Sequence, residues 1–213
     1  MTDFGTRSIR ERPASARNGL TATRERVLGR RLPRSFYARP TARVARELLG
    51  KMLVYDGPQG RRAALIVEVE AYLGARDPAS HAYRGPTVRT APMFGHPGRS
   101  YVYFVYGMYY CLNVVTERSG VAGAVLLRGA EPIVGVGDDP RGLAGPGKLA
   151  RAFGLTTAHT DLDLTRSPLS IRDGPAMPSS RVARATRIGL AEHATTLKPW
   201  RLYVRGSPGV SRP

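Results

Sequence analysis

Cysteine, lysine and long apolar runs are all scarce in this sequence. Of its 213 residues one is a cysteine, Cys111, so an internal disulfide and a disulfide-stapled secreted domain are excluded. The apolar runs are far too short to span a membrane, and the first thirty residues lack the apolar stretch of a secretory signal. Their Arg, Ser and Thr content weakly resembles an organelle transit peptide, but Asp3, Glu11 and Glu25 argue against one. We therefore expect a cytoplasmic protein without membrane contact.

Acidic residues are also few. The 16 Asp and Glu residues face 33 Lys and Arg residues, which leaves a formal net charge of +17. Three of these cations are lysines, so the positive charge is almost all arginine. A polyanion relieves such self-repulsion, and the planar guanidinium of arginine bridges phosphate oxygens and stacks on bases. We expect a nucleic acid partner, since a compositional drift toward Arg explains the shortage of Lys but not the excess of cations over acids.

The N-terminal residues differ in composition from the rest of the chain. Residues 1–32 are rich in arginine and poor in aromatic side chains, so they cannot bury enough apolar surface to fold. We predict a flexible basic arm over residues 1–32 and a single folded domain over residues 33–213. The arm either prolongs residence on a nucleic acid or is a dispensable tail, and the sequence leaves both open.

Short strands outnumber helices in the pattern of the folded part. Helices are predicted over residues 41–49, with Thr41 as N-cap, and over residues 145–153. Strands are predicted over residues 52–55, 63–70, 124–128 and 200–204, and a hairpin over residues 100–115. Residues 74–99 and 156–180 are predicted to be irregular, and long irregular loops are usually functional. The fold class is α+β: a single domain with a curved, mixed but mostly antiparallel sheet, a protruding aromatic hairpin and short flanking helices.

Two acids, Glu68 and Glu70, alternate with Val67 and Val69 in a predicted strand just before the first long loop. A carboxylate at the end of a strand beside a loop is well placed to act as a general base. The alternative is a pair of solvated acids on an exposed face of the strand.

Aromatic side chains are dense in the predicted hairpin. Six lie within ten residues: Tyr101, Tyr103, Phe104, Tyr106, Tyr109 and Tyr110. This density suits a surface that stacks flat ligands, and the positive charge indicates that those ligands are bases. The alternative is an aromatic layer in the core of a β-rich domain.

Other chemistries lack candidates in the sequence. The four histidines have no zinc-site spacing, no nucleophile elbow is present, and no lysine lies near the glutamates to form a Schiff base. The run from Gly145 to Lys148 lacks the spacing and the Ser or Thr of a phosphate-binding P-loop. Gly147 and Lys148 can still offer a backbone amide and a cation to a phosphate at a helix start.

Five motifs in order resemble the alkyladenine (3-methyladenine) DNA glycosylase family. They are VEVEAYLG at residues 67–74, Asp77 with Ser80 and His81, YVYFVYGMYYCLN at 101–113, LLRGAEP at 126–132 and GPGKL at 145–149. The resemblance spans about residues 32–212 and leaves the basic arm outside. Gly209 stands where many relatives have a bulky apolar residue, so the resemblance does not predict the packing of the C-terminal residues.

The resemblance implies a base-excision repair enzyme that needs no metal or organic cofactor. Such a monofunctional glycosylase rotates a damaged purine out of the duplex and hydrolyses its glycosidic bond, which leaves an abasic site. The expected lesions are 3-methyladenine, 7-methylguanine, hypoxanthine and ethenoadenine. The expected partner is double-stranded DNA that contains such purines, and the enzyme is expected to be a monomer.

The resemblance also implies catalytic roles. Glu70 corresponds to the base that activates water, and Arg128 and the backbone carbonyl of Ile188 correspond to the other groups that hold this water. The charge of Arg128 is expected to keep Glu70 ionised and to help position it.

Further roles concern the damaged nucleotide. Tyr72, His81 and Tyr103 correspond to the walls of the base pocket. Asn113 corresponds to the residue that disfavours the 2-amino group of guanine, and Tyr106 to the wedge that enters the base stack.

Two other function classes stay open at this point. One is a non-catalytic damage-binding or nucleic-acid-binding protein on the same fold, although every proposed catalytic position holds the expected residue type. The other is an enzyme that acts on RNA with the same pocket, although no reader of a 2′-hydroxyl can be identified.

Overall fold

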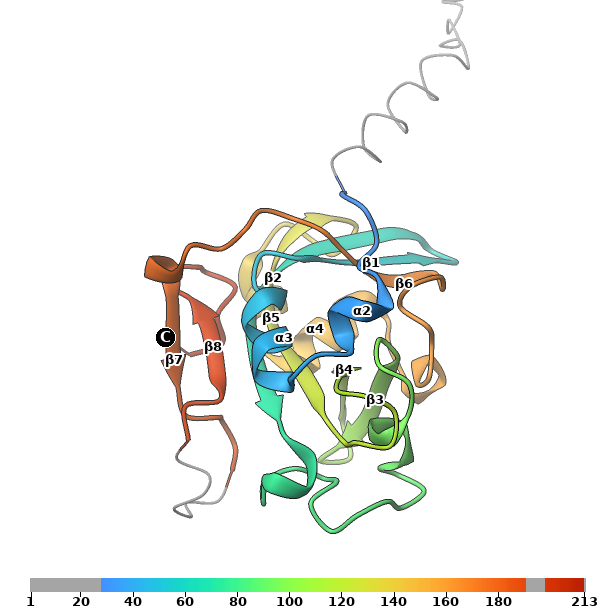
Figure 1. Cartoon of the computed structure of the whole chain (residues 1–213). Coiled ribbons are helices and arrows are strands. Elements are labelled where there is room, and N and C mark those ends of the chain that lie inside the picture. Colours follow the sequence, from blue (N-terminus) through green and yellow to red (C-terminus); the bar gives the residue numbers. More distant parts are fainter. Residues whose placement is uncertain (1–27, 191–197, 213) are drawn as a thin grey trace, which may run out of the picture.

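A curved antiparallel sheet with short helices against it forms the body of the molecule (Figure 1). The computed structural model describes residues 28–190 and 198–212. The strands are β1 (Met52–Gly57), β2 (Gly60–Tyr72), β3 (Ser100–Val105), β4 (Tyr109–Val115), β5 (Ala124–Val134), β6 (Leu169–Arg172), β7 (Val182–Ala185) and β8 (Arg201–Val204). The helices are α2 (Arg34–Tyr37), α3 (Thr41–Leu48) and α4 (Pro146–Phe153). Single 3₁₀ turns are η1 (Gly74–Arg76), η2 (Ala91–Phe94), η3 (Pro140–Leu143), η4 (Thr157–His159) and η5 (Ser179–Arg181).

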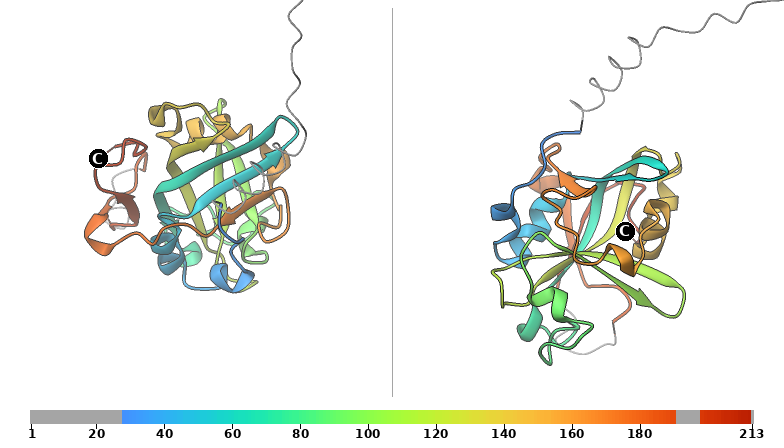
Figure 2. Two further views of the ribbon diagram at one scale, coloured as in Figure 1. Left: turned by 90° about the horizontal axis from the view of Figure 1, so that it is seen from above. Right: turned by 90° about the vertical axis from the view of Figure 1, so that its right-hand side faces the viewer.

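The strand order is β3-β4-β5-β2-β1-β6, and β8 joins β2 while pairing with β7. Every pairing between the described strands is antiparallel. This confirms the α+β class with a curved, mostly antiparallel sheet and short flanking helices. In the right-hand view of Figure 2, the β3–β4 hairpin extends beyond the body of the sheet beside α4.

The long strand β2 changes its partner part-way along one edge. Its first half, from Gly60 to Leu65, pairs with β1, whereas Glu68 to Glu70 pair with β8. The other edge pairs with β5 along residues 63–72. The second half of β2 therefore has a strand on both sides, and this is where the two acids lie.

Helices α3 and α4 contribute apolar residues to the core. Val44 and Leu48 of α3 and Leu149 and Phe153 of α4 are fully buried. Burying a side chain of this size contributes about 1.5–3 kcal/mol. Gly154 follows α4 with φ 66°, a left-handed conformation that ends the helix at little steric cost.

The start of α3 differs from the prediction. The N-cap is Pro40, and Thr41 is the first helical residue. The backbone N–H of Thr41 donates to Glu117 Oε1 at 2.7 Å, and its hydroxyl donates to the same oxygen at 2.8 Å. A carboxylate from a distant segment thus satisfies the free amide that a local capping side chain usually satisfies.

Three short elements were not predicted: α2, β6 and β7. Each spans four residues. β8 is equally short but was predicted, because residues 200–204 form an aromatic and β-branched run. β6 lies inside the region predicted to be irregular and completes the sheet by pairing with β1.

The folded part begins before residue 33. Leu28 is buried against Met52, Val54 and Ala63, and the N–H of Leu32 donates to Ile171 O at 2.9 Å. Residues 28–32, which the sequence places in the basic arm, therefore belong to the folded domain. The rest of the predicted arm, residues 1–27, lies outside the described residues.

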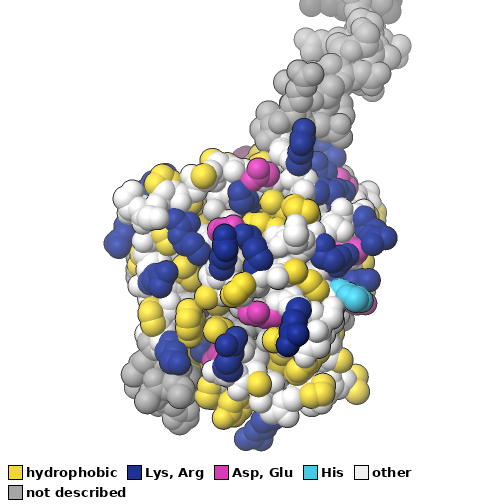
Figure 3. All heavy atoms as spheres, in the orientation of Figure 1, with side chains coloured by type: hydrophobic (Ala, Val, Ile, Leu, Met, Phe, Trp, Pro, Cys, Tyr) yellow, Lys and Arg dark blue, Asp and Glu magenta, His cyan; other side chains and the backbone are white. Residues whose placement is uncertain are grey.

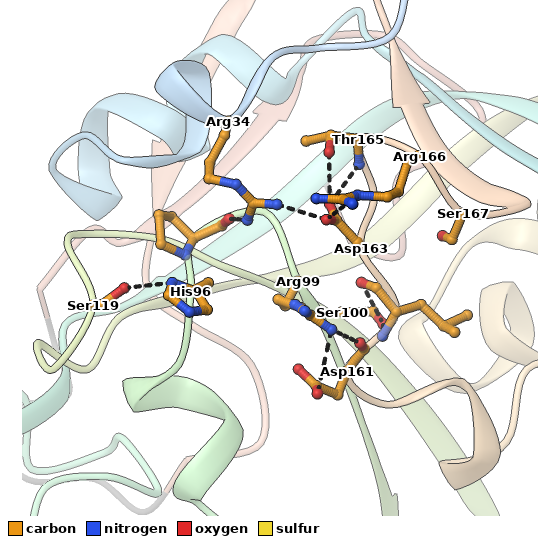
Figure 4. A network of polar contacts seen from close by, with 12 residues as sticks. Arg34, His96, Arg99, Ser100, Ser119, Asp161, Asp163, Thr165, Arg166 and Ser167 are labelled. Carbon is orange, nitrogen blue, oxygen red and sulfur yellow. Dashed lines mark hydrogen bonds and ion pairs between the residues drawn. The ribbon is translucent and has the colours of Figure 1, made fainter.

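A polar network fastens α2 to the segment after η4 (Figure 4). Asp163 accepts from Arg34 Nη2 at 2.6 Å, from Arg166 Nε at 2.8 Å and from Thr165 Oγ1 at 2.7 Å. Burial raises the pKa of Asp163, but the hydrogen bonds from Thr165 and the charge of Arg34 lower it by a larger amount. The net result is a pKa of about 2. The network is separate from the candidate site and stabilises the fold. None of the described helices is long and apolar enough to cross a membrane.

Candidate active site

One row of side chains runs across five strands on the same face of the sheet. Residues paired across antiparallel strands point to the same side, and the side alternates along each strand. The pairing joins Tyr101, Asn113, Leu126, Glu70 and Arg201 in this row. Their neighbours along each strand point to the opposite face, which carries the apolar core. Alternation thus brings the predicted base onto the same face as the aromatic hairpin.

Arg128 lies on the same face of the sheet as the acids. It follows Leu126 by two residues along β5, so alternation places its side chain on the face that carries Glu70. A β-bulge follows: the register steps from Leu127, opposite Val69, to Gly129, opposite Glu68, so Arg128 has no partner on β2. The Arg128 guanidinium lies 3.4 Å from Glu70 Oε1 through Nη1 and 3.5 Å from Glu68 Oε1 through Nε.

A cavity of about 460 Å³ opens on this face of the sheet. Nine of the ten residues that the sequence proposed for the site line it: Tyr72, His81, Tyr103, Tyr106, Asn113, Arg128, Gly147, Lys148 and Ile188. The tenth, Glu70, is fully buried directly behind the wall that Tyr72, Arg128 and Ile188 form. The structure therefore brings together residues that are up to 118 positions apart in sequence.

Glu70 is held from three sides. The N–H of Ile188 donates to Oε1 at 2.8 Å, the hydroxyl of Tyr72 donates to Oε2 at 2.9 Å, and Arg128 completes the shell. Burial raises the pKa of Glu70 above its ordinary value, and this effect outweighs the lowering by Arg128, by the Ile188 amide and by Tyr72. Arg128 does lower the pKa of Glu70, as expected, but the expectation left out burial, which raises this pKa by more.

Both acids are fully buried, so the alternative of two solvated acids is wrong. The structure adds a contact of Ile188 that the sequence did not suggest: its backbone N–H donates to the carboxylate of Glu70. The role of its backbone carbonyl as a holder of water stays a prediction.

The sequence missed the clamp that orients Tyr72. The guanidinium of Arg187 lies 4.6 Å from the centroid of the Tyr72 ring. Asp77 holds Arg187 through two bonds, Nη1 to Oδ2 at 2.5 Å and Nη2 to Oδ1 at 2.8 Å, and Nη1 also donates to Ala71 O at 3.0 Å. Burial and the nearby charge of Glu70 raise the pKa of Tyr72, so its hydroxyl stays protonated and acts as a donor. Arg187 stands beside Ile188 in the sequence, which was the available signal.

His81 and Tyr103 form an aromatic wall of the cavity. Their rings meet edge to face, with centroids 4.7 Å apart, and His81 Nδ1 lies 3.3 Å from the hydroxyl of Tyr101. Burial and the charge of Arg89 lower the pKa of His81, so its ring is neutral at pH 7. Tyr101, one of the hairpin aromatics expected to stack flat ligands, also lines the cavity. Sequence reasoning did not select Arg89, whose guanidinium lies 5.5 Å from the Tyr103 ring centroid.

Asn113 is fixed at the floor of the cavity. Its Nδ2 donates to Tyr101 O at 3.0 Å and to Cys111 O at 3.3 Å, so the side chain is tied to both strands of the hairpin. A group fixed in this way selects ligands by shape, because it cannot move aside without losing buried hydrogen bonds.

Tyr106 stands at the tip of the hairpin between β3 and β4. It is 76% exposed and has a left-handed backbone with φ 53°, which is uncommon for a residue other than glycine. Gly107, with φ 66°, completes the turn. An exposed ring held in a strained turn at the mouth of a cavity is a plausible inserting group.

Gly147 and Lys148 lie in the first turn of α4, after Pro146, and line the cavity. A Cβ on Gly147 would lie 2.8 Å from the ring of Tyr109, so only glycine lets the helix start pack against the hairpin. Lys148 is exposed and donates from Nζ to Arg141 O at 3.1 Å. The structure thus places both residues beside the cavity, and their contact with phosphate stays a prediction.

Comparison with known proteins agrees with this geometry. A sequence profile described as Methylpurine-DNA glycosylase (MPG) matches residues 35–208, which is most of the chain. The chain belongs to the methylpurine-DNA glycosylase family. This confirms the resemblance and places the chain among DNA glycosylases of DNA repair.

Several relatives carry the printed name "Putative 3-methyladenine DNA glycosylase". One from Myxococcus xanthus (strain DK1622) is 48% identical over 182 residues, which cover 85% of this chain and 93% of that protein. One from Anaeromyxobacter dehalogenans (strain 2CP-1 / ATCC BAA-258) is 50% identical over 185 residues, with 86% of each chain covered. One from Methanocella arvoryzae is 47% identical over 194 residues, covering 85% of this chain and 96% of that protein.

Proposed function

We propose that this member of the methylpurine-DNA glycosylase family is a monofunctional enzyme that removes damaged purines from duplex DNA and leaves an abasic site. The observation that carries the proposal is the buried carboxylate of Glu70 behind one wall of an aromatic cavity. Arg128, Tyr72 and the Ile188 amide hold it there in one orientation. A base inside a duplex cannot reach such a cavity, so the nucleotide must rotate out of the stack.

Stacking supports recognition of a purine. Tyr72, Tyr103 and neutral His81 offer flat surfaces to a rotated base. A cationic base over an electron-rich ring gains about 1–2 kcal/mol. Since Arg187 and Arg89 already lie over the two tyrosine rings, this attraction is weaker here, and neutral hypoxanthine and ethenoadenine belong on the substrate list with 3-methyladenine and 7-methylguanine.

The chemical step is a hydrolysis. The bond between the purine nitrogen and C1′ breaks, its electron pair leaves with the base, and the sugar passes through an oxocarbenium-like state. Water attacks C1′, and ionised Glu70 accepts the proton that this water loses. An alkylated purine carries the positive charge that makes it a good leaving group, whereas a neutral purine must be protonated as it leaves. No step in this scheme requires an amine nucleophile, so the DNA strand stays intact.

Charge and the hairpin support binding to DNA. The net charge is +17, and Lys and Arg side chains spread over the face shown in Figure 3 with few acids between them. Contacts to phosphates give affinity without sequence preference. We assign Tyr106 as the wedge that fills the space of the rotated nucleotide, and Lys148 with the Gly147 amide as phosphate contacts. Action as a monomer on chromosomal DNA in the cytoplasm completes the proposal.

The test is base release from duplex oligonucleotides that each carry one hypoxanthine or ethenoadenine, with DNA containing 7-methylguanine in parallel. Wild type and Glu70→Gln are compared with and without hot alkali. Strand breaks at the lesion that need alkali and disappear in Glu70→Gln support the proposal. Breaks without alkali would indicate a lyase, and tight salt-sensitive binding without release of any base would favour the non-catalytic binding protein. Competition between DNA and RNA duplexes for binding tests the alternative of an enzyme that acts on RNA, which predicts that the RNA duplex competes better.

A further inference from the structure

The second buried acid, Glu68, has no role in the proposed chemistry, although it has more hydrogen-bond donors than Glu70. Arg201 Nη1 donates to Glu68 Oε1 at 2.9 Å, and Ser211 donates through its N–H to Oε2 at 2.7 Å and through its hydroxyl to Oε1 at 3.0 Å. A fully buried carboxylate is costly unless such donors compensate it. Two of these donor groups come from one serine.

Arg128 links this second carboxylate to the first. Its Nε lies 3.5 Å from Glu68 Oε1 and makes no hydrogen bond, whereas its Nη1 lies 3.4 Å from Glu70 Oε1. Its third nitrogen, Nη2, donates to the hydroxyl of Ser211 at 3.4 Å. The Ser211 hydroxyl therefore accepts from Arg128 and donates to Glu68, and the guanidinium has one anchor outside the two acids.

The segment that carries Ser211 sits in van der Waals contact with β5. A Cβ on Gly129 would lie 2.2 Å from Gly209 O, and a Cβ on Gly209 would lie 2.4 Å from Ala130 O. Glycine at both positions lets the two backbones touch, which places Ser211 over Glu68. The family profile ends at residue 208, so Ser211 lies outside the matched region.

We propose that Ser211 is a positioning residue that sets the orientation of the Arg128 guanidinium between the two carboxylates. The inference rests on the proposed function, because Arg128 and Glu70 are the groups it serves. Without the Ser211 hydroxyl, Glu68 Oε1 loses a donor and Arg128 loses an anchor. The guanidinium then turns toward Glu68 and away from Glu70, which weakens the attraction that favours ionised Glu70.

The chain offers a matched control in the same segment. The hydroxyl of Ser207 donates to Glu131 Oε1 at 2.6 Å and accepts from the N–H of Gly209 at 3.3 Å. Ser207→Ala therefore removes a serine–carboxylate hydrogen bond from the same C-terminal segment without touching Arg128. Ser211→Thr keeps the hydroxyl and serves as the conservative variant.

The first experiment measures base release in single turnover as a function of pH, together with the affinity for lesion DNA. In Ser211→Ala we expect a rate about tenfold lower near pH 6, a pH midpoint shifted upward, and unchanged affinity, since a hydrogen bond to a charged group is lost. Ser211→Thr should restore the wild-type pH midpoint. Ser207→Ala should lower the melting temperature but leave the pH midpoint unchanged. A wild-type midpoint in Ser211→Ala, or an equal shift in Ser207→Ala, overturns the inference.

A second readout does not depend on activity. The ¹³C resonance of the Glu70 carboxyl, assigned by its loss in Glu70→Gln, reports the titration of this group directly. Besides Glu68 and Arg128, the titratable and charged groups around it are Tyr72, Tyr103, Cys111, Arg187 and Arg201, and neither serine variant alters these groups. We expect an upward shift in Ser211→Ala alone. If wild type releases no base, the proposed function fails, while this titration still decides the role of Ser211.

Discussion

At the scale of the residue, the site depends on a carboxylate that the fold makes harder to ionise. Glu70 has no contact with solvent, and burial raises its pKa more than Arg128, Tyr72 and the Ile188 amide lower it. A general base with a raised pKa is a stronger proton acceptor once it is ionised. Two hydrogen bonds, from Tyr72 and the Ile188 amide, and the ion pair with Arg128 keep it in one orientation when it carries the charge.

The first prediction concerns pH and stability at Glu70. Since folding raises its pKa, the stabilisation from this group is complete below the ordinary value of 4.5 and is lost as pH rises through the raised pKa. Glu70→Gln is neutral at every pH, so its melting temperature relative to wild type should increase between pH 5 and pH 8. Base release should fall by at least about 100-fold in this variant.

Glu47 is the control, because folding shifts its pKa in the other direction. Burial raises the pKa of Glu47, but hydrogen bonds and charge from Arg39 and Arg43 lower it below the ordinary value. Relative to wild type, Glu47→Gln should therefore lose stability as pH rises through the acidic range. The same trend in both variants would contradict the assignment.

The second prediction concerns the clamp on Tyr72. Arg187 and Asp77 form a pair whose side chains are 0% and 4% exposed. Asp77→Asn leaves the buried guanidinium uncompensated and should cost about 3–5 kcal/mol in the free energy of unfolding. Asp161→Asn is the matched control, because the pair of Asp161 with Arg99 is 67% and 30% exposed and is expected to contribute less than about 1 kcal/mol. Chemical denaturation of both variants measures the difference.

The strand pattern marked Glu70 as a candidate base but left a solvated acid open, and the wedge role of Tyr106 came from the family resemblance. The contacts of Arg187 and Arg89 were not predicted, since each lies over a ring from another part of the chain. For Arg187, its place beside Ile188 was a signal that was not used. The use of the Ile188 N–H was also hidden, because either of its backbone groups could face the site.

At the scale of the element, irregularities in the sheet build the site. The bulge in β5 leaves Arg128 without a partner on β2, next to both acids, and the change of partner along β2 encloses Glu68 and Glu70 between two strands. Alternation predicted which residues share a face. It could not predict the bulge, because one extra residue in a strand leaves no mark on an apolar sequence such as that of β5.

The long elements and the short strand β8 were predicted, whereas α2, β6 and β7 were not. The strands around Glu70, the hairpin over residues 100–115 and helix α4 have enough residues to show a pattern. β7 spans four residues, and its pairing with β8 depends on contacts that only the folded chain makes. The boundary at residue 32 was misplaced for a similar reason, since Leu28 gains its apolar partners from three other segments.

The third prediction separates the fold of the hairpin from its function. Tyr106→Gly relieves a left-handed backbone, worth about 1–2 kcal/mol, and adds about 0.5–1 kcal/mol of chain entropy in the unfolded state. The free energy of unfolding should therefore change by less than about 1 kcal/mol. Base release should fall at least about tenfold, because the ring no longer stacks in the duplex. Tyr106→Phe keeps the ring and should retain activity; equal release by Tyr106→Gly would show that the ring is not the wedge.

At the scale of the whole molecule, the excess of arginine governs encounter with DNA. A net charge of +17 creates a field that attracts a polyanion regardless of sequence. Most of the acids in the described part of the chain form ion pairs, such as that of Asp163 with Arg34. The excess of cations is therefore left to interact with a polyanion.

The fourth prediction concerns salt. The logarithm of the affinity for undamaged duplex should fall linearly with the logarithm of salt concentration, with a slope of about 0.9 for each phosphate contacted. Lys148→Ala should reduce this slope by about one contact. Lys51→Ala removes the same charge, but Lys51 is paired with Asp173 at 2.5 Å away from the cavity, and this variant should keep the wild-type slope. Fluorescence anisotropy over a salt series measures both.

The distance along the chain between the buried acids and their partners also sets the order in which the site can assemble during synthesis. Arg201 and Ser211 follow Glu68 by 133 and 143 residues, and Ile188 follows Glu70 by 118. At ribosomal rates of about 5–20 residues per second this is a delay of roughly 6–29 s, during which both carboxylates leave the ribosome without these donors. Hydrated and charged, they oppose early burial of the second half of β2. Leu202 and Val204 of β8 belong to the main apolar core, so the docking of β8 completes this core and brings Arg201 to Glu68 in one late step.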